Sequence, residues 1–332
     1  MVRSARFASI ELTVPLVEVA RLRKAFGAVL AVDDVSFAVE RGEVLGFLGP
    51  NGAGKSTTMK VIAGVLAPTD GTAFVAGEDV RSHPIEAKRR IGYLPEGSPL
   101  YGDMTPDGFL DFVGRTRLMP RDRRRRAIGE VMERLGLDEV RHRRIETLSK
   151  GFRRRVGVAQ AILHDPDVLI LDEPTDGLDP NQKHEVRELI RSMGDTKAVI
   201  ISTHILEEVD AVCDRAVIID HGRVVLDATP AQLYARSPDY NAISLIVAGA
   251  DVHRATAILG KLDGVAGAER LEEGPQGIRL VVRPTQGQFI SDRVAAALRD
   301  NGIAAHELHG TTGRLDDVFR AITSSTSRVE AR

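Results

Sequence analysis

Short apolar runs separated by turns alternate with stretches of helical periodicity through most of this chain. From Val17 onward, the runs VEVARL and VSFAV are rich in β-branched residues, and EVLGFLG leads a buried type of strand into a glycine-rich turn. In the following KSTTMKVIAGVL, the apolar residues Met59, Ile62, Ala63 and Leu66 recur at three- and four-residue spacing. The order strand, loop, helix is therefore predicted for this part of the chain.

A different pattern begins near Tyr101 and continues to Leu163. Thr105 is a plausible helix cap, Pro106 suits the first helical position, and the letters FLDFV that follow shortly have helical period. We expect a helical subdomain at about residues 98–163. Strand patterns return in VLILDEP, AVIIST and RAVIID, which favours an α/β domain that extends over residues 17–235.

The C-terminal third of the chain predicts a second, smaller domain. The turn-forming letters SPDYN indicate a linker at residues 236–241. Residues 242–324 then have the order βαββαβ, typical of the ferredoxin-like split unit, although a plain α+β extension without that fold remains an alternative. Residues 325–332 form a short tail. Residues 1–16 show no convincing periodicity, and a disordered lead, a misplaced start and an extra edge strand all remain open.

Composition narrows the classes of partner. The 332 residues carry a net charge of only −2, so no global basic field indicates a nucleic-acid partner. The arginine-rich Arg121–Arg126 is more typical of a solvated helical face than of a binding patch. Cys213 is the single cysteine, which excludes an internal disulfide and suits the reducing cytoplasm. No apolar run approaches the roughly 20 residues that a bilayer span requires.

The letters GPNGAGKST match the phosphate-binding G-x-x-x-x-G-K-[ST] motif, after a strand and before a helix as the motif requires. The motif predicts that glycine-permitted backbone N–H groups cradle nucleotide phosphates at a positive helix N-terminus. Lys55 is expected to reach the β- and γ-phosphates, Ser56 to bind Mg²⁺ and Thr57 to bond the α-phosphate. This phosphate loop consists of Gly49, Pro50, Asn51, Gly52, Ala53, Gly54, Lys55, Ser56 and Thr57.

Two later strand ends add the other groups that an NTPase needs. Asp172 ends the apolar run VLIL and is the expected Mg²⁺ ligand. Glu173 follows directly and is placed to polarise the attacking water, the alternative being a cap of the next turn. His204, after the strand AVIIS, is expected to contact the γ-phosphate rather than to serve only as a structural histidine.

These motifs, together with LSKGF and LILDEPTDGLD, resemble the nucleotide-binding subunit of an ATP-binding cassette (ABC) transporter over about Val17 to Leu233. The resemblance implies that two subunits meet head to tail. The signature turn, residues 148–152, would then cover ATP held by the partner's phosphate loop. In that arrangement Ser149, Lys150 and Gly151 would contact the γ-phosphate. The resemblance also implies that Phe26 stacks on adenine, the alternative being that Phe26 is a core residue. It further implies that Asp179 lies at the dimer interface and that Glu96 coordinates Mg²⁺.

Three positions depart from the commoner family pattern. Lys150 replaces a glycine and would place a positive charge near phosphate, Phe152 replaces a glutamine, and Glu96 replaces a glutamine with an anionic oxygen. The neighbouring Arg153 to Arg155 are expected to line the interface or solvent. The spellings LPEGSPLY and LSKGF are similar to those of gliding-motility-type ATPases and their exporter relatives. The C-terminal RLDDVF is similar to the ending of drug- and polysaccharide-export ATPases, or is simply an amphipathic helix.

The resemblance thus implies an α/β fold: a P-loop NTPase ABC cassette, with a RecA-like core, a β-subdomain and the helical insertion, followed by the small α+β domain. It implies an ATPase with ATP and Mg²⁺ as cofactors, a homodimer, and separate integral-membrane permease subunits encoded nearby. The protein is expected in the cytoplasm, bound peripherally to the inner face of the cell membrane. Its expected role is to drive export. A soluble non-transport ABC ATPase and an importer ATPase are the alternatives, and the cargo is not encoded in these motifs.

Overall fold

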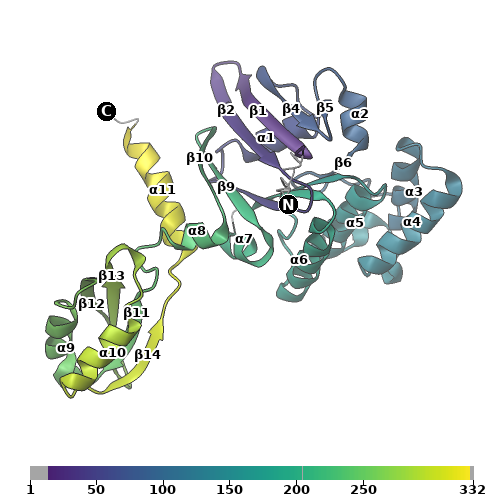
Figure 1. The fold of residues 1–332 in the computed structure, drawn as a ribbon. Helices are drawn as coiled ribbons and strands as arrows, with labels where there is room; N and C mark the ends of the chain where they lie inside the picture. Colours follow the sequence, from purple (N-terminus) through teal and green to yellow (C-terminus); the bar gives the residue numbers. More distant parts are fainter. Residues whose placement is uncertain (1–13, 204, 330–332) are drawn as a thin grey trace, which may run out of the picture. The chain divides into compact units, whose positions relative to one another are not determined.

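The computed structural model describes residues 14–203 and 205–329 and divides the chain into two compact units, Met1–Asp227 and Ala228–Arg332 (Figure 1). His204, most of the expected N-terminal lead and the end of the expected tail lie outside the described residues. None of the helices within the described ranges is both long and apolar enough to span a bilayer.

A six-stranded sheet forms the centre of the first unit. Strands β6, β7, β8, β3 and β9 pair in parallel, and their side chains are almost all buried, as expected of a sheet covered on both faces. In spatial order the strands are β10 (Arg223–Ala228), β9 (Arg215–Asp220), β3 (Val44–Leu48), β8 (Ala198–Thr203), β7 (Val168–Asp172) and β6 (Ile91–Leu94). The carboxyl ends of the parallel strands therefore meet at one edge, where the predicted site residues lie.

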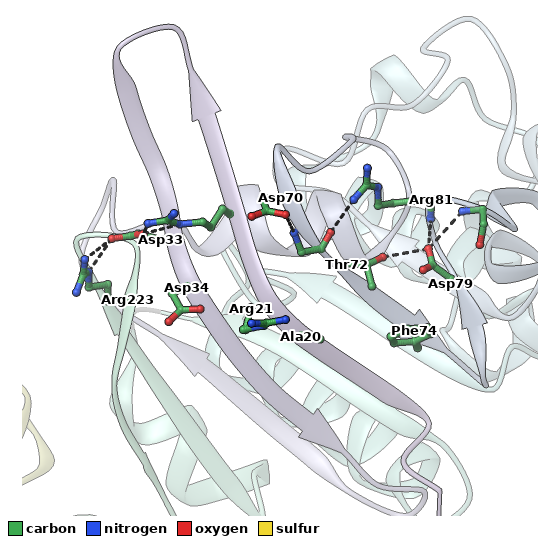
Figure 2. A pocket seen from close by; sticks show the side chains of 13 residues that line it. Ala20, Arg21, Asp33, Asp34, Asp70, Thr72, Phe74, Asp79, Arg81 and Arg223 are labelled. Carbon is green, nitrogen blue, oxygen red and sulfur yellow. Dashed lines mark hydrogen bonds and ion pairs between the residues drawn. The ribbon is translucent and has the colours of Figure 1, made fainter.

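An antiparallel sheet forms the β-subdomain, in the spatial order β2 (Val29–Val39), β1 (Val17–Phe26), β4 (Asp70–Val75) and β5 (Glu78–Asp79). Its apolar face shares one core with helix α1 (Lys55–Ile62) and the central sheet, including Phe37, Phe47 and Met59. Asp33 of β2 also binds Arg23 of β1 and Arg223 of β10 (Figure 2). These ion pairs fasten the two sheets together and hold the pKa of Asp33 below its usual value.

The helical subdomain follows β6, and its helices α3, α4 and α5 contact one another (Figure 1). The predicted cap is confirmed, because Thr105 Oγ1 accepts a hydrogen bond from Gly108 N at 3.2 Å and Pro106 begins α3. The arginine run begins α4 and is mostly solvated, but Arg124 departs from this expectation by pairing with Asp111. The helices of this unit are α1, α2 (Pro84–Arg89), α3 (Pro106–Thr116), α4 (Arg121–Arg134), α5 (Lys150–Ile162), α6 (Pro180–Gly194) and α7 (Leu206–Val212), with 3-10 turns at Asp138–Val140 and Ile145–Thr147.

The second unit has the predicted βαββαβ order. Its four strands form an antiparallel sheet in the order β12-β13-β11-β14, which is the strand order of the split unit. Val252 and Leu259 of α9 and Val294 and Leu298 of α10 fill a separate core against the sheet. The elements are α8 (Pro230–Tyr234), β11 (Ile243–Val247), α9 (Val252–Leu259), β12 (Val265–Gly274), β13 (Gly277–Pro284), α10 (Ser291–Asp300), β14 (Ala305–Gly310) and α11 (Leu315–Val329), with 3-10 turns at Gly249–Asp251 and Thr285–Gly287.

The division between the units falls before α8, whereas the sequence indicated a linker at residues 236–241. The physical reason is that α8 contacts α11 of the second unit. Ser237, within the expected linker, is buried, and its Oγ accepts hydrogen bonds from the backbone N–H groups of Asp239 and Arg314.

Candidate functional site

The phosphate loop joins the buried strand β3 to helix α1, as predicted. Gly49 and Gly54 are required by close backbone approach: a Cβ at Gly49 would lie 2.3 Å from the carbonyl oxygen of Ile219, and one at Gly54 would lie 2.5 Å from that of Ala31. Gly52 and Gly54 also have φ angles of 83° and 104°, which side-chain-bearing residues rarely adopt. The glycines thus hold the loop close to the end of β9.

The N-terminus of α1 has no side-chain cap, which is also true of α2, α4, α7, α9 and α10. Helices α3, α5, α6 and α8 are capped by Thr105, Ser149, Asp179 and Thr229, respectively. The N-cap of α1 is Gly54, and no side chain accepts a hydrogen bond there. The first backbone N–H groups of a helix have no intrahelical acceptor, so this end of α1 suits an anionic ligand.

Lys55 is the buried cation of this loop. It is only 7% exposed, and its Nζ donates to the carbonyl oxygens of Gly49 at 2.6 Å and Pro50 at 3.0 Å. Burial lowers the pKa of Lys55, and the negative charges of Glu173, Asp172 and Glu96 oppose this effect. The structure therefore brings three acidic residues from distant parts of the sequence into the electrostatic neighbourhood of Lys55.

Asp172 ends β7 with a carboxylate that is 1% exposed. Ser202 of β8 donates its hydroxyl proton to Oδ1, while Oδ2 has no hydrogen-bond partner among the described residues. A buried carboxylate oxygen without a partner is costly, and a cation would satisfy it. Within the described residues no group of three or more histidine, cysteine, aspartate or glutamate side chains is gathered for a metal. A metal here would take its other ligands from a hydroxyl such as that of Ser56, from water and from phosphate.

Glu173 has an unusual backbone conformation. Its φ angle is 50°, in the left-handed region that glutamate rarely adopts. Its backbone N–H donates to both the carbonyl oxygen of Ser202 at 3.2 Å and the hydroxyl of Ser202 at 3.1 Å. Strained residues of this kind are concentrated at functional sites, where the surrounding contacts hold them in place.

Glu96 is exposed two residues after β6. Tyr93 of β6 lies nearby, with a buried hydroxyl that lacks a hydrogen-bond partner among the described residues. Burial, followed by the charges of Asp172 and Glu96, raises the pKa of Tyr93 to about 12. The loop after β6 and the end of β7 are therefore electrostatically coupled.

The signature turn begins α5 and contacts the loop before α6. Ser149 caps α5 by accepting from Phe152 N at 3.3 Å, and a Cβ at Gly151 would lie 2.4 Å from Gln182 Oε1. Lys150 Nζ pairs with Asp176 Oδ2 at 2.9 Å, so within this chain its charge is already compensated. Asp179 lies in the same loop as the cap of α6.

Phe26 ends β1, and its side chain is 50% exposed, which rules out a place in the core. The Lys24 ammonium lies 5.1 Å from the centre of the phenyl ring. This leaves the ring available for stacking. His204 lies outside the described residues, directly after Thr203, the last residue of β8.

Two arginines of the signature region lie where the sequence did not place them. Arg153 is exposed, as expected of a residue at an interface or in solvent, but Arg154 is only 5% exposed. The side chain of Arg155 is 13% exposed and pairs with Glu185 of α6 in the same chain, not with solvent or a second copy. A signal for the burial of Arg154 was present in the sequence, because Arg154 is three residues after Gly151 and four before Val158, both on the buried face of α5.

A hollow of about 1060 Å³ in the β-subdomain is a weaker candidate site (Figure 2). Three of its four aspartates already have partners. Asp33 pairs with Arg223, Asp70 accepts from the backbone N–H of Gly71, and Asp79 accepts from Thr72 and from the backbone N–H of Arg81. Arginines and aspartates balance around it, so no single charge is selected. We assign it a role in joining the sheets.

The phosphate loop and β7 both lie within a region that matches a known protein family. A family model described as ABC transporter matches residues 32–176. The Nod factor export ATP-binding protein I of Ralstonia nicotianae is 33% identical over 320 residues, which cover 95% of each chain. The chain belongs to the ATP-binding proteins of ABC transporters.

Other members of the ABC family match the first unit. The ABC transporter ATP-binding protein NatA of Bacillus subtilis is 41% identical over 65% of this chain and 89% of its own length. The daunorubicin/doxorubicin resistance ATP-binding protein DrrA of Streptomyces peucetius is 39% identical over 65% of this chain and 66% of its own. A solved ATP-binding subunit of an ABC transporter is 31% identical and has a TM-score of 0.62, covering 66% of this chain and 91% of that chain.

The family relationship confirms the predicted ABC fold and identifies the chain as an ATP-binding ABC ATPase. Its relatives include proteins named for export and for drug resistance.

Proposed function

We propose that this ABC ATPase is the hydrolytic subunit of an exporter, in which two copies bind two ATP molecules head to tail and drive a separate membrane permease. The observation that carries the chemistry is the convergence of three groups: the uncapped start of α1, the buried Lys55, and the unpartnered Oδ2 of Asp172. An anion and a cation are both needed to complete this arrangement, as in a nucleotide phosphate with its metal.

The residues present fit Mg²⁺. Asp172 Oδ2 and the Ser56 hydroxyl would hold it, with Glu96 near enough to act through its charge. When bound, Mg²⁺ would neutralise charge on the phosphate oxygens. Lys55 orients the β- and γ-phosphates, and Glu173 accepts a proton from the attacking water. His204 is assigned a γ-phosphate contact, and Thr57 an α-phosphate contact.

The second copy completes the site. Ser149 caps the 13-residue helix α5, which begins with Lys150 and Gly151, and both Ser149 and Lys150 are exposed. Ser149 Oγ accepts from Phe152 N, so its hydroxyl proton is available to the γ-phosphate of the partner's ATP. Because Lys150 already pairs with Asp176, it would have to exchange that carboxylate for phosphate. Phe26 stacks on adenine, and Asp179 lies at the interface in this proposal.

A groove in the first unit supports the permease partner. It has a volume of about 420 Å³, and its lining combines apolar residues with polar and basic ones. The lining residues are Ala63, Val65, Ile85, Lys88, Arg89, Ile91, Tyr93, Thr116, Arg117 and Leu118. Val65, Ile85 and Leu118 on it are 62%, 61% and 78% exposed. Exposed apolar groups gathered along a groove favour a protein partner. We infer that a cytoplasmic segment of the permease binds there and holds the ATPase at the inner face of the membrane.

Export is favoured over import by two facts. The similar proteins named above include a Nod factor export protein and a drug-resistance protein. The second unit has the helix-containing βαββαβ order rather than the small barrel expected of an importer ATPase. No observation favours a role on ribosomes or nucleic acid.

The decisive experiment measures ATP binding and hydrolysis by the full chain, alone and co-purified in detergent with the membrane proteins encoded beside it. Glu173→Gln should retain ATP binding and lose about 100-fold or more in kcat. Glu188→Gln, an exposed carboxylate of α6 paired with Arg191, is the matched control and should retain full activity.

The permease part has its own test. Ile85→Asp and Leu118→Asp should prevent co-purification of the permease, whereas Leu271→Asp, which changes an exposed leucine of the second unit, should not. A chain that binds ATP yet never hydrolyses it, with or without its membrane partner, would refute the proposed activity. Genomic neighbours that include a solute-binding protein for uptake would refute export.

A further inference from the structure

Arg154 is the most deeply buried arginine side chain of the signature helix. It lies on the second turn of α5, five residues after the Ser149 cap, and is only 5% exposed. The adjacent Arg155 points elsewhere, pairing with Glu185 and donating to the carbonyl oxygen of Leu135. Burial of a guanidinium is costly unless its donors are used, so the acceptors around Arg154 indicate its role.

The guanidinium of Arg154 binds consecutive backbone carbonyl groups. Nε donates to Pro174 O at 3.2 Å, and Nη2 donates to both Asp172 O and Glu173 O. Nη1 donates to Ser98 Oγ at 2.6 Å. Arginine has five N–H donors in one rigid plane, and no other side chain can serve this many acceptors at once.

Carboxylates surround this cation. Burial lowers the pKa of Arg154, and the charges of Asp176, Asp172, Glu173 and Glu96 oppose that effect. The positive charge therefore lies among the acidic residues of the site, while its N–H groups bind backbone oxygens.

The conformation of Glu173 explains why the carbonyl contacts matter. Its φ angle of 50° costs free energy, so other contacts must hold it. Ser202 binds the N–H of Glu173 from one side, and Arg154 binds its C=O from the other. The peptide groups on both sides of Glu173 are thereby fixed, and with them the direction in which its carboxylate leaves the backbone.

Arg154 also connects three segments that are far apart in sequence. Its own helix begins at the signature turn, and its carbonyl acceptors lie at the end of β7 and directly after it. Its fourth acceptor, Ser98, lies in the loop after β6, which also contains Glu96. A displacement of α5 would therefore move two loops together: the loop after β7, which carries Glu173, and the loop after β6, which carries Glu96.

We propose that Arg154 is a positioning residue that holds Glu173 in its active orientation and couples that orientation to the signature helix. This inference rests on the proposed role of Glu173 as the group that prepares water. The four acceptors of Arg154 all lie outside the phosphate loop, so its effect is on the step after ATP has bound.

The test compares Arg154→Gln and Arg154→Lys with Arg155→Gln in the full chain. Arg155→Gln also removes a largely buried guanidinium from α5, so it controls for loss of helix stability. The measurements are ATP affinity by equilibrium binding, kcat and KM for ATP with Mg²⁺, and the thermal unfolding temperature. Ser98→Ala removes one acceptor of Arg154 without removing its charge, and serves if the other variants do not fold.

Arg154→Gln should lower kcat by about 10- to 100-fold, because small misplacements of a catalytic group have effects of this size. KM and ATP affinity should stay within about threefold of the unchanged protein, since the phosphate loop is intact. Lysine keeps the charge without the planar fork, so Arg154→Lys should be intermediate. Arg155→Gln should leave kcat unchanged, and Ser98→Ala should lower it severalfold.

Three results would overturn the inference. The first is an Arg154→Gln protein with unchanged kcat. The second is a loss of activity that parallels losses of ATP affinity and thermal stability, which would indicate a purely structural role. The third is full activity in Arg154→Lys, which would show that charge alone suffices. If Glu173→Gln itself retained activity, the proposed function would fail independently of these outcomes.

Discussion

His164, two residues after α5, should make the first unit sensitive to mild acid. Its Nε2 lies 3.0 Å from the carbonyl oxygen of Ile91, so Nε2 carries the proton and donates. Its Nδ1 is buried and has no partner among the described residues. Burial first, and then the nearby charge of Arg117, lowers the pKa of His164 to about 4. Protonation would create a second N–H with no acceptor, beside an arginine.

The sign and size of the effect follow from this pKa. An unfolded histidine titrates near 6.5, so between pH 6.5 and pH 4 the unfolded chain binds a proton that the folded chain does not. The stabilising contribution is therefore complete above about pH 6.5 and is lost as the pH falls through about 4. Full loss corresponds to about 3 kcal/mol, and about 2 kcal/mol should already be lost at pH 5.

Urea unfolding of the full chain at pH 7 and pH 5 tests this prediction. His164→Gln keeps a donor for the carbonyl oxygen of Ile91 but cannot titrate. The free energy of unfolding of both proteins should fall from pH 7 to pH 5, and the fall should be smaller in His164→Gln by about 2 kcal/mol. His142→Gln, at an exposed histidine of the same subdomain, is the control and should behave like the unchanged protein. An equal pH dependence for His164→Gln and the unchanged protein would show that His164 is not buried in its neutral form.

Three further predictions concern the nucleotide site. Gly49→Ala places a methyl group 2.3 Å from a backbone oxygen and should abolish ATP binding, measured by equilibrium dialysis, with loss of thermal stability. Ser202→Ala removes the hydroxyl that donates to Asp172 and should weaken Mg²⁺-dependent ATP hydrolysis by about 10-fold, read from a Mg²⁺ titration of the rate. Asp176→Asn releases Lys150 and should strengthen ATP-dependent dimerisation at low salt, measured by analytical ultracentrifugation, with the gain disappearing at high salt. An unchanged dimer constant at low salt would contradict the competition between Asp176 and phosphate.

The fold and much of the site could be predicted because the residues that define them lie close together in the sequence. A phosphate loop needs glycines, a lysine and a hydroxyl within one turn and one helix start, so GPNGAGKST specifies it locally. Asp172 was identifiable because an acidic residue directly after a buried apolar run must lie at a strand end. The βαββαβ order of the second unit followed from periodicity alone, since strands and helices have different periods.

Other features depend on contacts between distant segments, which no local pattern encodes. The sequence placed Arg154 at an interface or in solvent, and only packing of α5 against the end of β7 shows that it binds carbonyl oxygens there. Lys150 was expected to place a positive charge near phosphate, and its ion pair with Asp176 emerged only from the fold. The boundary between the two units lies before α8 and not at residues 236–241, because α8 contacts α11 of the second unit.

The sequence by itself therefore determined which nucleotide chemistry this protein carries, because phosphate binding depends on residue types at fixed local spacing. The tertiary structure alone decided how the groups are held: the buried, unpartnered oxygen of Asp172, the left-handed backbone of Glu173, and the arginine that fixes it. The physical reason is that burial, desolvation and hydrogen-bond geometry are properties of segments brought together in space. They arise only when the central sheet has formed and its strand ends lie side by side.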